Sequence, residues 1–422
     1  MASRASIYVL KQYLSTASRR ELQWLSLDPD IGPVQIWHQA QGNRFAIHSP
    51  AIHTVAKWPN PTGILSRIGL HGLKRRLDQL YFPSPTILYV RRAVSALSKV
   101  IGRDLSEGRK VCLITPVPPH DLVLAGLRLK QRHPGIRWII DWQDLWSYDE
   151  SYFCQLPKWW RQPAVALERL VVKACDLNVS TNDHAGRVLV ERCGASPDRV
   201  RAIPHAFETG LCEQFPPVQR THAEQGRPPR IGFLGNLFKP PKVPGERVMA
   251  ALEAVWTQGV AFEFHIYGDK YLERVCRTPL NGRPWAILHP MQSHEQILPA
   301  VAECDWLLLS LADNPNTRVT LHGKLPYYLA LNKPIVALVP EDSAVADVIR
   351  ETGVGFVFGD EQMWTRRLVE VLSDCGSAAS ALGRDEQAVA RYSWHSISGL
   401  WLQALECQEA QAMRSRAAAV PG

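Results

Sequence analysis

The sequence predicts an α/β protein built from two doubly wound domains, each with a parallel β-sheet covered by helices. At 422 residues the chain is too long for one ordinary hydrophobic core and suits two domains of roughly 200 residues each. From about residue 110 onward, short apolar runs alternate with segments of helical periodicity, as in parallel β–α units. Residues 208–230 interrupt this alternation with prolines, a glycine and mixed charges, and are therefore predicted to link the domains.

The N-terminal domain is predicted to span residues 1–207. Apolar residues spaced three and four positions apart predict amphipathic helices over residues 121–133 and 163–174. Short apolar runs predict its strands, at residues 6–10, 111–114, 138–140 and 177–180.

The C-terminal domain is predicted to span residues 231–390. A last helix is predicted at residues 397–410, within a final segment, 391–422, that we expect to pack back across the domains. The strands of this domain are expected at residues 231–235, 262–267, 306–309 and 335–339, each followed by turn residues and a helical pattern.

The composition is that of a globular protein, with 46% apolar and 21% charged residues. No stretch approaches the roughly 20 uninterrupted apolar residues that a membrane-spanning helix needs. Residues 1–14 lack the apolar core and cleavage site of a secretory signal, so we expect a cytoplasmic location. The nine cysteines form no CxxC pair, which favours reduced thiols over disulfides or a zinc site.

A candidate phosphate site lies at the end of the strand predicted at 231–235. Gly235 and Asn236 end this strand and Lys239 and Lys242 follow, before a helical pattern begins. Backbone N–H groups at such a turn, with nearby lysines, are suited to bind a phosphate. A tight turn carrying two solvated lysines would give the same pattern.

Several segments, taken in order, resemble the GT-B glycosyltransferases that use nucleotide-sugar donors, especially the mostly retaining group that builds bacterial surface glycans. They are residues 232–236 (GFLGN), 266–269 (IYGD), 287–290 (ILHP), 302–309 (AECDWLLL), 323–330 (GKLPYYLA) and 392–394 (YSW), with 141–146 (DWQDLW) and 202–204 (AIP) in the N-terminal half.

The resemblance implies two Rossmann-like domains that face each other across a cleft, with the donor nucleotide on the C-terminal domain and the acceptor on the N-terminal domain. Lysines and helix N-termini can stabilise the departing diphosphate, so no metal and no other cofactor is expected. By position, the donor-binding residues would be Gly235, Asn236, Lys239, Lys242, Gly323 and Lys324, with His289 and Met291 near the base, largely through backbone groups.

The match departs from the family at two carboxylates. The family places two glutamates around its donor-binding helix, the second of which binds the ribose, and these positions hold Val319 and Tyr327 here. The Tyr327 hydroxyl, Glu341 or Asp342 could supply the ribose contact instead. The same departures are also compatible with a noncatalytic relative of these glycosyltransferases.

Two polar residues that follow strands in the N-terminal half are candidate catalytic residues. His120 could contact the transferred sugar, and Asp144 could orient the acceptor or act as a base. An ordinary loop histidine and a helix-capping aspartate are the alternatives. Trp142 and Trp146 could line a sugar-stacking wall, although core packing is the more usual role of such aromatic residues.

The formal charge of +8 is unevenly placed, since residues 51–100 hold eight lysines and arginines and one acid, Asp78. Within this stretch, residues 64–81 alternate basic and apolar residues as a basic amphipathic helix does. Such a helix could rest on an anionic inner membrane face, or could be a solvated helix packed on its own domain. No recognition motif accompanies the charge, so nucleic acid is not an expected partner.

The leading hypothesis is therefore transfer of a sugar from a nucleotide-sugar donor to a glycan or lipid-linked acceptor in bacterial-type surface polysaccharide synthesis. A noncatalytic GT-B-like nucleotide-binding or scaffold subunit is one alternative. A sugar-nucleotide epimerase of the same fold is another.

Overall fold

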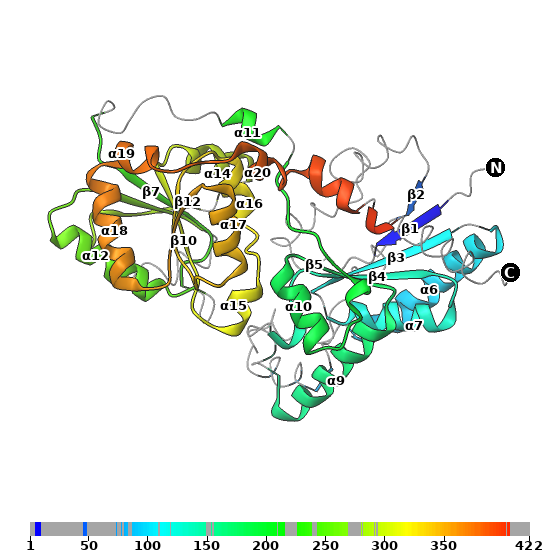
Figure 1. The fold of residues 1–422 in the computed structure, drawn as a ribbon. Helices are drawn as coiled ribbons and strands as arrows, with labels where there is room; N and C mark the ends of the chain where they lie inside the picture. The colour runs from blue at the N-terminus through cyan, green and yellow to red at the C-terminus, as the bar shows by residue number, and fades with distance from the viewer. Residues whose placement is uncertain are drawn as a thin grey trace. The chain divides into compact units, whose positions relative to one another are not determined.

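In a computed structural model, the chain forms two compact units (Figure 1). Unit 1 comprises Met1–Pro204 with Ile397–Gly422, and unit 2 comprises His205–Ser396. The structure describes residues 5–9, 45–48, 73, 77, 80–82, 87–108, 110–118, 120–148, 153, 156–208, 210–215, 226–238, 243–268, 280, 282–290, 292, 294–401 and 403–405.

Unit 1 contains a six-stranded sheet of parallel strands in the order β2-β1-β3-β4-β5-β6. Its central strands are buried, and in β4 all residues after Arg137 are covered, as expected for a parallel sheet with helices on both faces. The strands are β1 Ala5–Val9, β2 Phe45–His48, β3 Lys110–Val117, β4 Arg137–Trp142, β5 Leu177–Ser180 and β6 Val200–Ala202.

The helices of unit 1 pack closely on this sheet. A Cβ placed on Gly126 of α7 would lie 2.4 Å from Nε1 of Trp138 on β4, so glycine lets the helix approach the strand. Asn182 caps α10 by accepting the N–H of Ala185 at 2.9 Å. The elements are α6 Ile87–Ser106, α7 Leu122–Arg132, η2 Trp146–Tyr148, α9 Lys158–Ala174, α10 Asp183–Glu191 and η3 Pro197–Arg199.

Unit 2 contains a second six-stranded parallel sheet, in the order β12-β11-β10-β7-β8-β9. An ion pair at the start of the unit joins Arg227 Nη1 to Asp305 Oδ2 at 2.7 Å. The strands are β7 Arg230–Leu234, β8 Glu263–Tyr267, β9 Ala286–His289, β10 Trp306–Ser310, β11 Ile335–Leu338 and β12 Gly355–Phe358.

The helices of unit 2 cover a separate hydrophobic core on each face of the sheet. On one face, α12 and α18 lie side by side over Phe233 and Leu308 (Figure 1). On the other, α14, α16 and α17 cover Leu307 and Leu309. The helices are α11 Leu211–Gln214, α12 Gly245–Thr257, α14 His294–Ala302, α15 Pro315–Val319, α16 Leu325–Ala330, α17 Ala344–Thr352, α18 Glu361–Ser373, α19 Cys375–Ser380 and α20 Glu386–Ala390.

The chain returns from unit 2 to unit 1 near its end. Phe207 forms a β-bridge with Ser393, and residues 394–401 and 403–405 are helical. Nη1 of Arg137 in β4 donates a hydrogen bond to the carbonyl oxygen of Leu405 at 2.6 Å, which fastens this helix to unit 1.

The predicted α/β fold class is confirmed, and each predicted strand coincides with an observed one within two or three residues. The basic segment 64–81 lies largely outside the described residues, of which it includes Leu73, Leu77, Leu80 and Tyr81. Among the helices that the structure describes, none is long and apolar enough to cross a membrane.

Candidate functional site

The carboxyl ends of β7 and β10 meet at the point where the chain reverses its direction of winding in unit 2. After β7 the chain adds β8 and β9 on one side and then returns to add β10, β11 and β12 on the other. A switch point of this kind opens a crevice outside the carboxyl ends of the strands, where doubly wound sheets bind ligands. The predicted donor-binding segments follow β7 and form α16, which borders the same point.

Gly235 forms a turn directly after β7. Its φ of +110° is a conformation that L side chains rarely adopt, and its N–H donates to the carbonyl oxygen of Tyr267 at 2.7 Å. Oδ1 of Asn236 accepts the N–H of Phe238 at 3.1 Å, so this side chain closes the loop that follows the turn. The predicted contacts Lys239, Lys242 and Met291 lie outside the described residues.

A buried lysine brings positive charge to this turn. Lys324 is 7% exposed, and its Nζ lies 3.6 Å from the centroid of the Phe233 ring, whose face attracts a cation. A Cβ placed on Gly235 would lie 4.0 Å from the same Nζ. The neighbouring Gly323 is exposed, and a Cβ there would meet no atom within 4 Å. Lys324 and Gly235, predicted together from the sequence, are therefore adjacent in space.

Tyr328 fixes α16 across the switch point. Its buried hydroxyl accepts the N–H of Leu234 at 2.9 Å and donates to the carbonyl oxygen of Leu308 at 3.2 Å. One side chain thus joins the end of β7 to β10 and fixes the helix that begins directly after Lys324, its N-cap residue. Tyr327, which the sequence resemblance aligns with a carboxylate, is half-buried and packs against the core on the α16 face of the sheet.

His289, at the end of β9, takes part in a chain of hydrogen bonds across three strands. Its Nε2 lies 2.8 Å from Nδ1 of His265, whose Nε2 lies 3.0 Å from Oε2 of Glu263. Nε of Arg230 donates to the same carboxylate oxygen at 2.7 Å. The His289 ring also stacks on Tyr267, with centroids 4.2 Å apart. The side chain of His289 is thus held by the sheet.

Burial affects the ionisation of these hydrogen-bonded side chains. Burial lowers the pKa of both His265 and His289, which favours neutral rings near pH 7. Burial acts to raise the pKa of Glu263, but hydrogen bonds from His265 and Arg230 outweigh it, and the pKa of Glu263 is lowered. The carboxylate is therefore ionised and orients the His265 ring.

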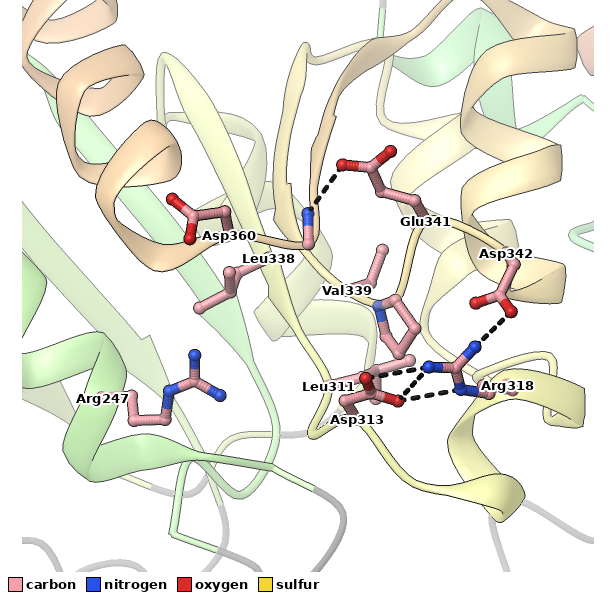
Figure 2. Close-up of a pocket in the computed structure, with 11 residues that line it drawn as sticks. Arg247, Leu311, Asp313, Arg318, Leu338, Val339, Glu341, Asp342 and Asp360 are labelled. Carbon is pink, nitrogen blue, oxygen red and sulfur yellow. Dashed lines mark hydrogen bonds and ion pairs between the residues drawn. The ribbon is translucent and has the colours of Figure 1, made fainter.

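A pocket of about 350 Å³ lies at the carboxyl ends of β10, β11 and β12 (Figure 2). Arg318 on α15 crosses its floor and binds Asp313, with Nη2 and Oδ1 2.7 Å apart, and also Asp342. Oε1 of Glu341 accepts the N–H of Gly359 at 3.4 Å. The two acids that the sequence offered for a ribose contact, Glu341 and Asp342, therefore line this pocket, whereas Gly235 and Lys324 do not.

Within the described part of unit 2, the polar side chains form no group arranged as a metal centre. Among the residues that the structure describes, no three histidine, cysteine, aspartate or glutamate side chains are grouped as metal ligands. The cysteines in the described ranges are free thiols, and burial raises the pKa of Cys304 to about 12.

In unit 1, the loops that carry His120 and Asp144 are joined at the carboxyl ends of β3 and β4. The carbonyl oxygen of Val117 accepts the N–H groups of Gln143 at 2.9 Å and of Asp144 at 3.2 Å. His120 is 6% exposed, and its ring centroid lies 5.1 Å from that of Trp146. The strand order places β3 at the switch point of this sheet, beside β1.

The structure adds Asp141, the first residue of the 141–146 motif, to the candidate residues of this edge. Asp141 is the next-to-last residue of β4 and is 6% exposed. Burial raises its pKa to about 6, although the hydrogen bond that Gln143 Nε2 donates at 3.3 Å acts to lower it. The signal for it in the sequence is an acid directly after the three apolar residues 138–140. Trp142 and Trp146 are both buried in the core, as expected if these tryptophans pack in the core and do not line a sugar-stacking wall.

Solved structures of similar fold span nearly the whole chain. HepE of Anabaena in complex with UDP-glucose matches with a TM-score of 0.59 and 11% identity, over 95% of this chain and 99% of that one. The lipopolysaccharide outer core galactosyltransferase WaaB matches with a TM-score of 0.52 and 11% identity, over 96% and 99%. A candidate UDP-N-acetylglucosamine 2-epimerase from Listeria monocytogenes matches with a TM-score of 0.55 and 11% identity, over 97% and 98%.

These likenesses, at identities this low, concern the fold. No protein-family model matches the sequence, and no curated protein matches it. The chain has the GT-B fold, as its motifs predicted, with a doubly wound parallel sheet in each of its two units.

Proposed function

We propose that this chain is a glycosyltransferase that moves a sugar from a nucleotide-sugar donor to a glycan or lipid-linked acceptor, in surface polysaccharide synthesis of the bacterial type. The observation that carries the proposal is the buried Lys324 ammonium beside the Gly235 turn, at the switch point of unit 2. A nucleoside diphosphate suits this place because its negative charge would meet the buried Lys324 ammonium. It would also lie at the Gly235 turn, where a side chain on residue 235 would cause strain.

The donor diphosphate would be bound without a metal ion. As the bond to the sugar breaks, negative charge grows on the departing phosphate, and Lys324 is already in place to stabilise it. Lys239 and Lys242 would contribute from the loop after Gly235, with Asn236, Gly323 and the 289–291 loop as further contacts. The Tyr327 hydroxyl would bind the ribose in place of the family's glutamate.

The acceptor would bind at the carboxyl edge of unit 1. His120 would contact the transferred sugar and Asp144 would orient the acceptor hydroxyl, because these side chains follow β3 and β4 at the end of the sheet that faces ligands in doubly wound folds. The likeness to HepE, solved in complex with UDP-glucose, and to WaaB, a lipopolysaccharide outer core galactosyltransferase, supports this class of donor and acceptor. Residues 64–81 would hold the protein at the cytoplasmic membrane face.

A calorimetric titration with UDP, ADP and GDP tests the donor site. We expect one of these nucleotides to bind with 1:1 stoichiometry in the presence of EDTA. Absence of binding by all three would contradict the proposal, and binding that requires a divalent cation would contradict its metal-independent form.

A noncatalytic nucleotide-binding subunit is the second candidate, favoured by Val319 and Tyr327 at the two positions where the family has carboxylates. Nucleotide binding without release of UDP or another diphosphate from any donor, across a panel of acceptors, would favour it. An epimerase, favoured by the likeness to the Listeria protein, would instead convert the donor sugar without an acceptor.

A further inference from the structure

The outer face of α9 carries an apolar stripe bordered by cations. Trp159 is 66% exposed and Leu170 is 52% exposed, and Pro163 and Ala166 lie exposed between them. These four positions recur at intervals of four, three and four residues, so they form one continuous line on the helix. Single exposed apolar residues are ordinary, whereas an exposed stripe marks a surface that meets a partner.

The charges on α9 are all of one sign at its surface. Lys158, Arg169 and Lys173 are exposed along one border of the stripe. The one acid of this helix, Glu168, is 1% exposed and accepts the N–H of Ser147 at 3.0 Å. The outer face of α9 is therefore apolar and cationic.

Aromatic contacts connect this helix to the candidate acceptor edge of unit 1. The Trp160 ring on α9 stacks on Phe82 with centroids 4.8 Å apart, and Phe82 lies 6.0 Å from Trp146. Trp146 in turn contacts His120. Leu80, two residues before Phe82, is 66% exposed and adds a further apolar side chain next to the segment that packs on α9.

We infer that the outer face of α9 binds the surface of an anionic lipid bilayer, with Trp159 and Leu170 inserted among the lipids and Lys158, Arg169 and Lys173 against the headgroups. Tryptophan favours the membrane interface, because its ring is apolar and its N–H remains hydrated or hydrogen-bonded. Each lysine or arginine at such a surface adds attraction to anionic headgroups.

The charge pattern favours a bilayer over a second copy of the chain. A symmetric dimer through α9 would place this face against itself and bring lysines and arginines against one another, which is unfavourable. An anionic bilayer offers the opposite charge over the whole length of the stripe. The inference is consistent with a lipid-linked acceptor and does not depend on sugar transfer, because lipid binding can be measured without a donor.

Flotation with vesicles of phosphatidylglycerol and phosphatidylcholine in equal parts, and of phosphatidylcholine alone, tests the inference. We expect the wild-type chain to float with the anionic vesicles and to remain behind with the neutral ones. Trp159→Ala should weaken partitioning roughly tenfold, and the double variant Lys158→Glu/Lys173→Glu at least as much. Trp159→Phe, which keeps an aromatic ring, should retain most of the binding.

A matched control lies on α18 of unit 2, where Met363 is 56% exposed and Arg366 is also exposed. Met363→Ala/Arg366→Glu changes the same kinds of side chain and should float as the wild type does. Circular dichroism and UDP titration of the α9 variants should match the wild type, which separates loss of lipid binding from misfolding and from failure of the donor site.

Three outcomes would overturn the inference. One is failure of the wild-type chain to float with anionic vesicles, and another is wild-type flotation of the α9 variants. The third is self-association of the wild-type chain that Trp159→Ala abolishes, without vesicle binding, which would assign the stripe to a second copy.

Discussion

The ammonium of Lys324 lies against the face of the Phe233 ring, 3.6 Å from its centroid, beside the turn at which β7 ends. A buried cation held in this way needs no large side-chain movement to meet a diphosphate, so its contribution to binding should be large. Lys324→Met keeps the length of the side chain and removes the charge. We expect it to weaken UDP binding by about tenfold to a hundredfold, the effect of losing a charge-assisted hydrogen bond.

Calorimetry of the Lys324→Met variant checks this prediction. Lys333, which is 5% exposed and precedes β11 at the opposite edge of the same sheet, provides a matched buried lysine. Lys333→Met should leave UDP affinity unchanged. Equal loss of affinity in the two variants would indicate a general effect on unit 2 and would count against a specific role for Lys324.

Tyr328 should contribute mainly to stability. Tyr328→Phe leaves the N–H of Leu234 and one acceptor site of Leu308 without their partner in a buried place, at a cost of about 1–3 kcal/mol in the free energy of unfolding. Urea denaturation followed by circular dichroism measures this cost. A variant as stable as the wild type would show that the hydroxyl does not join the two strands.

Tyr327, by contrast, should contribute to donor binding. If its hydroxyl binds the ribose, Tyr327→Phe lowers UDP affinity by roughly fivefold, the value of one hydrogen bond. Glu341→Gln should leave UDP affinity unchanged, because Glu341 lines a different pocket. The reverse result, with affinity lost in Glu341→Gln alone, would move the ribose contact to the pocket beside Arg318.

The residues of unit 1 should affect turnover and not donor binding. His120→Asn and Asp144→Asn are expected to reduce the rate of donor-derived UDP release in the presence of acceptor by about a hundredfold, which is typical of a lost acid–base or orienting group. UDP affinity should stay within twofold of wild type, as measured by calorimetry. Full activity in both variants would remove these residues from the catalytic site.

The buried carboxyl group of Asp141 should make the free energy of unfolding depend on pH. Burial raises its pKa from the ordinary value of 3.8 to about 6 in the folded chain, so between these pH values the folded state holds a proton that the unfolded state has released. The free energy of unfolding therefore falls as pH rises through this window, by up to about 3 kcal/mol.

Asp141→Asn should remove this contribution. The variant is expected to gain stability relative to the wild type as pH rises from about 4 to 7, measured by urea denaturation at several pH values. A stability difference that stays constant across this range would show that the Asp141 carboxyl titrates normally.

The sequence predicted the strands of the two sheets well because parallel central strands are continuous apolar runs, as at residues 306–309 and 335–339. It did not predict β2, β6, β9 or β12, which lie toward the sheet edges and are short and half-buried where the structure describes their side chains. Edge strands bury less surface and so carry a weaker pattern.

The candidate site was predicted less completely for a different reason. Gly235 and Lys324 stand out in local motifs, but they are nearly ninety positions apart, and their proximity depends on the strand order. The roles of Phe233 and Tyr328 depend on the direction of side chains from a strand and a helix that pack together, which local patterns do not give. Asp141 is unusual because its carboxyl group is buried, and this burial arises only when the sheet has folded.

A crystal structure of the chain with UDP would show directly where the donor diphosphate binds. We expect the diphosphate at the Gly235 turn, with a phosphate oxygen within hydrogen-bonding distance of Lys324 Nζ and the ribose beside Tyr327. A diphosphate bound elsewhere, such as between Arg247 and Arg318 in the pocket at the ends of β10, β11 and β12, would contradict it.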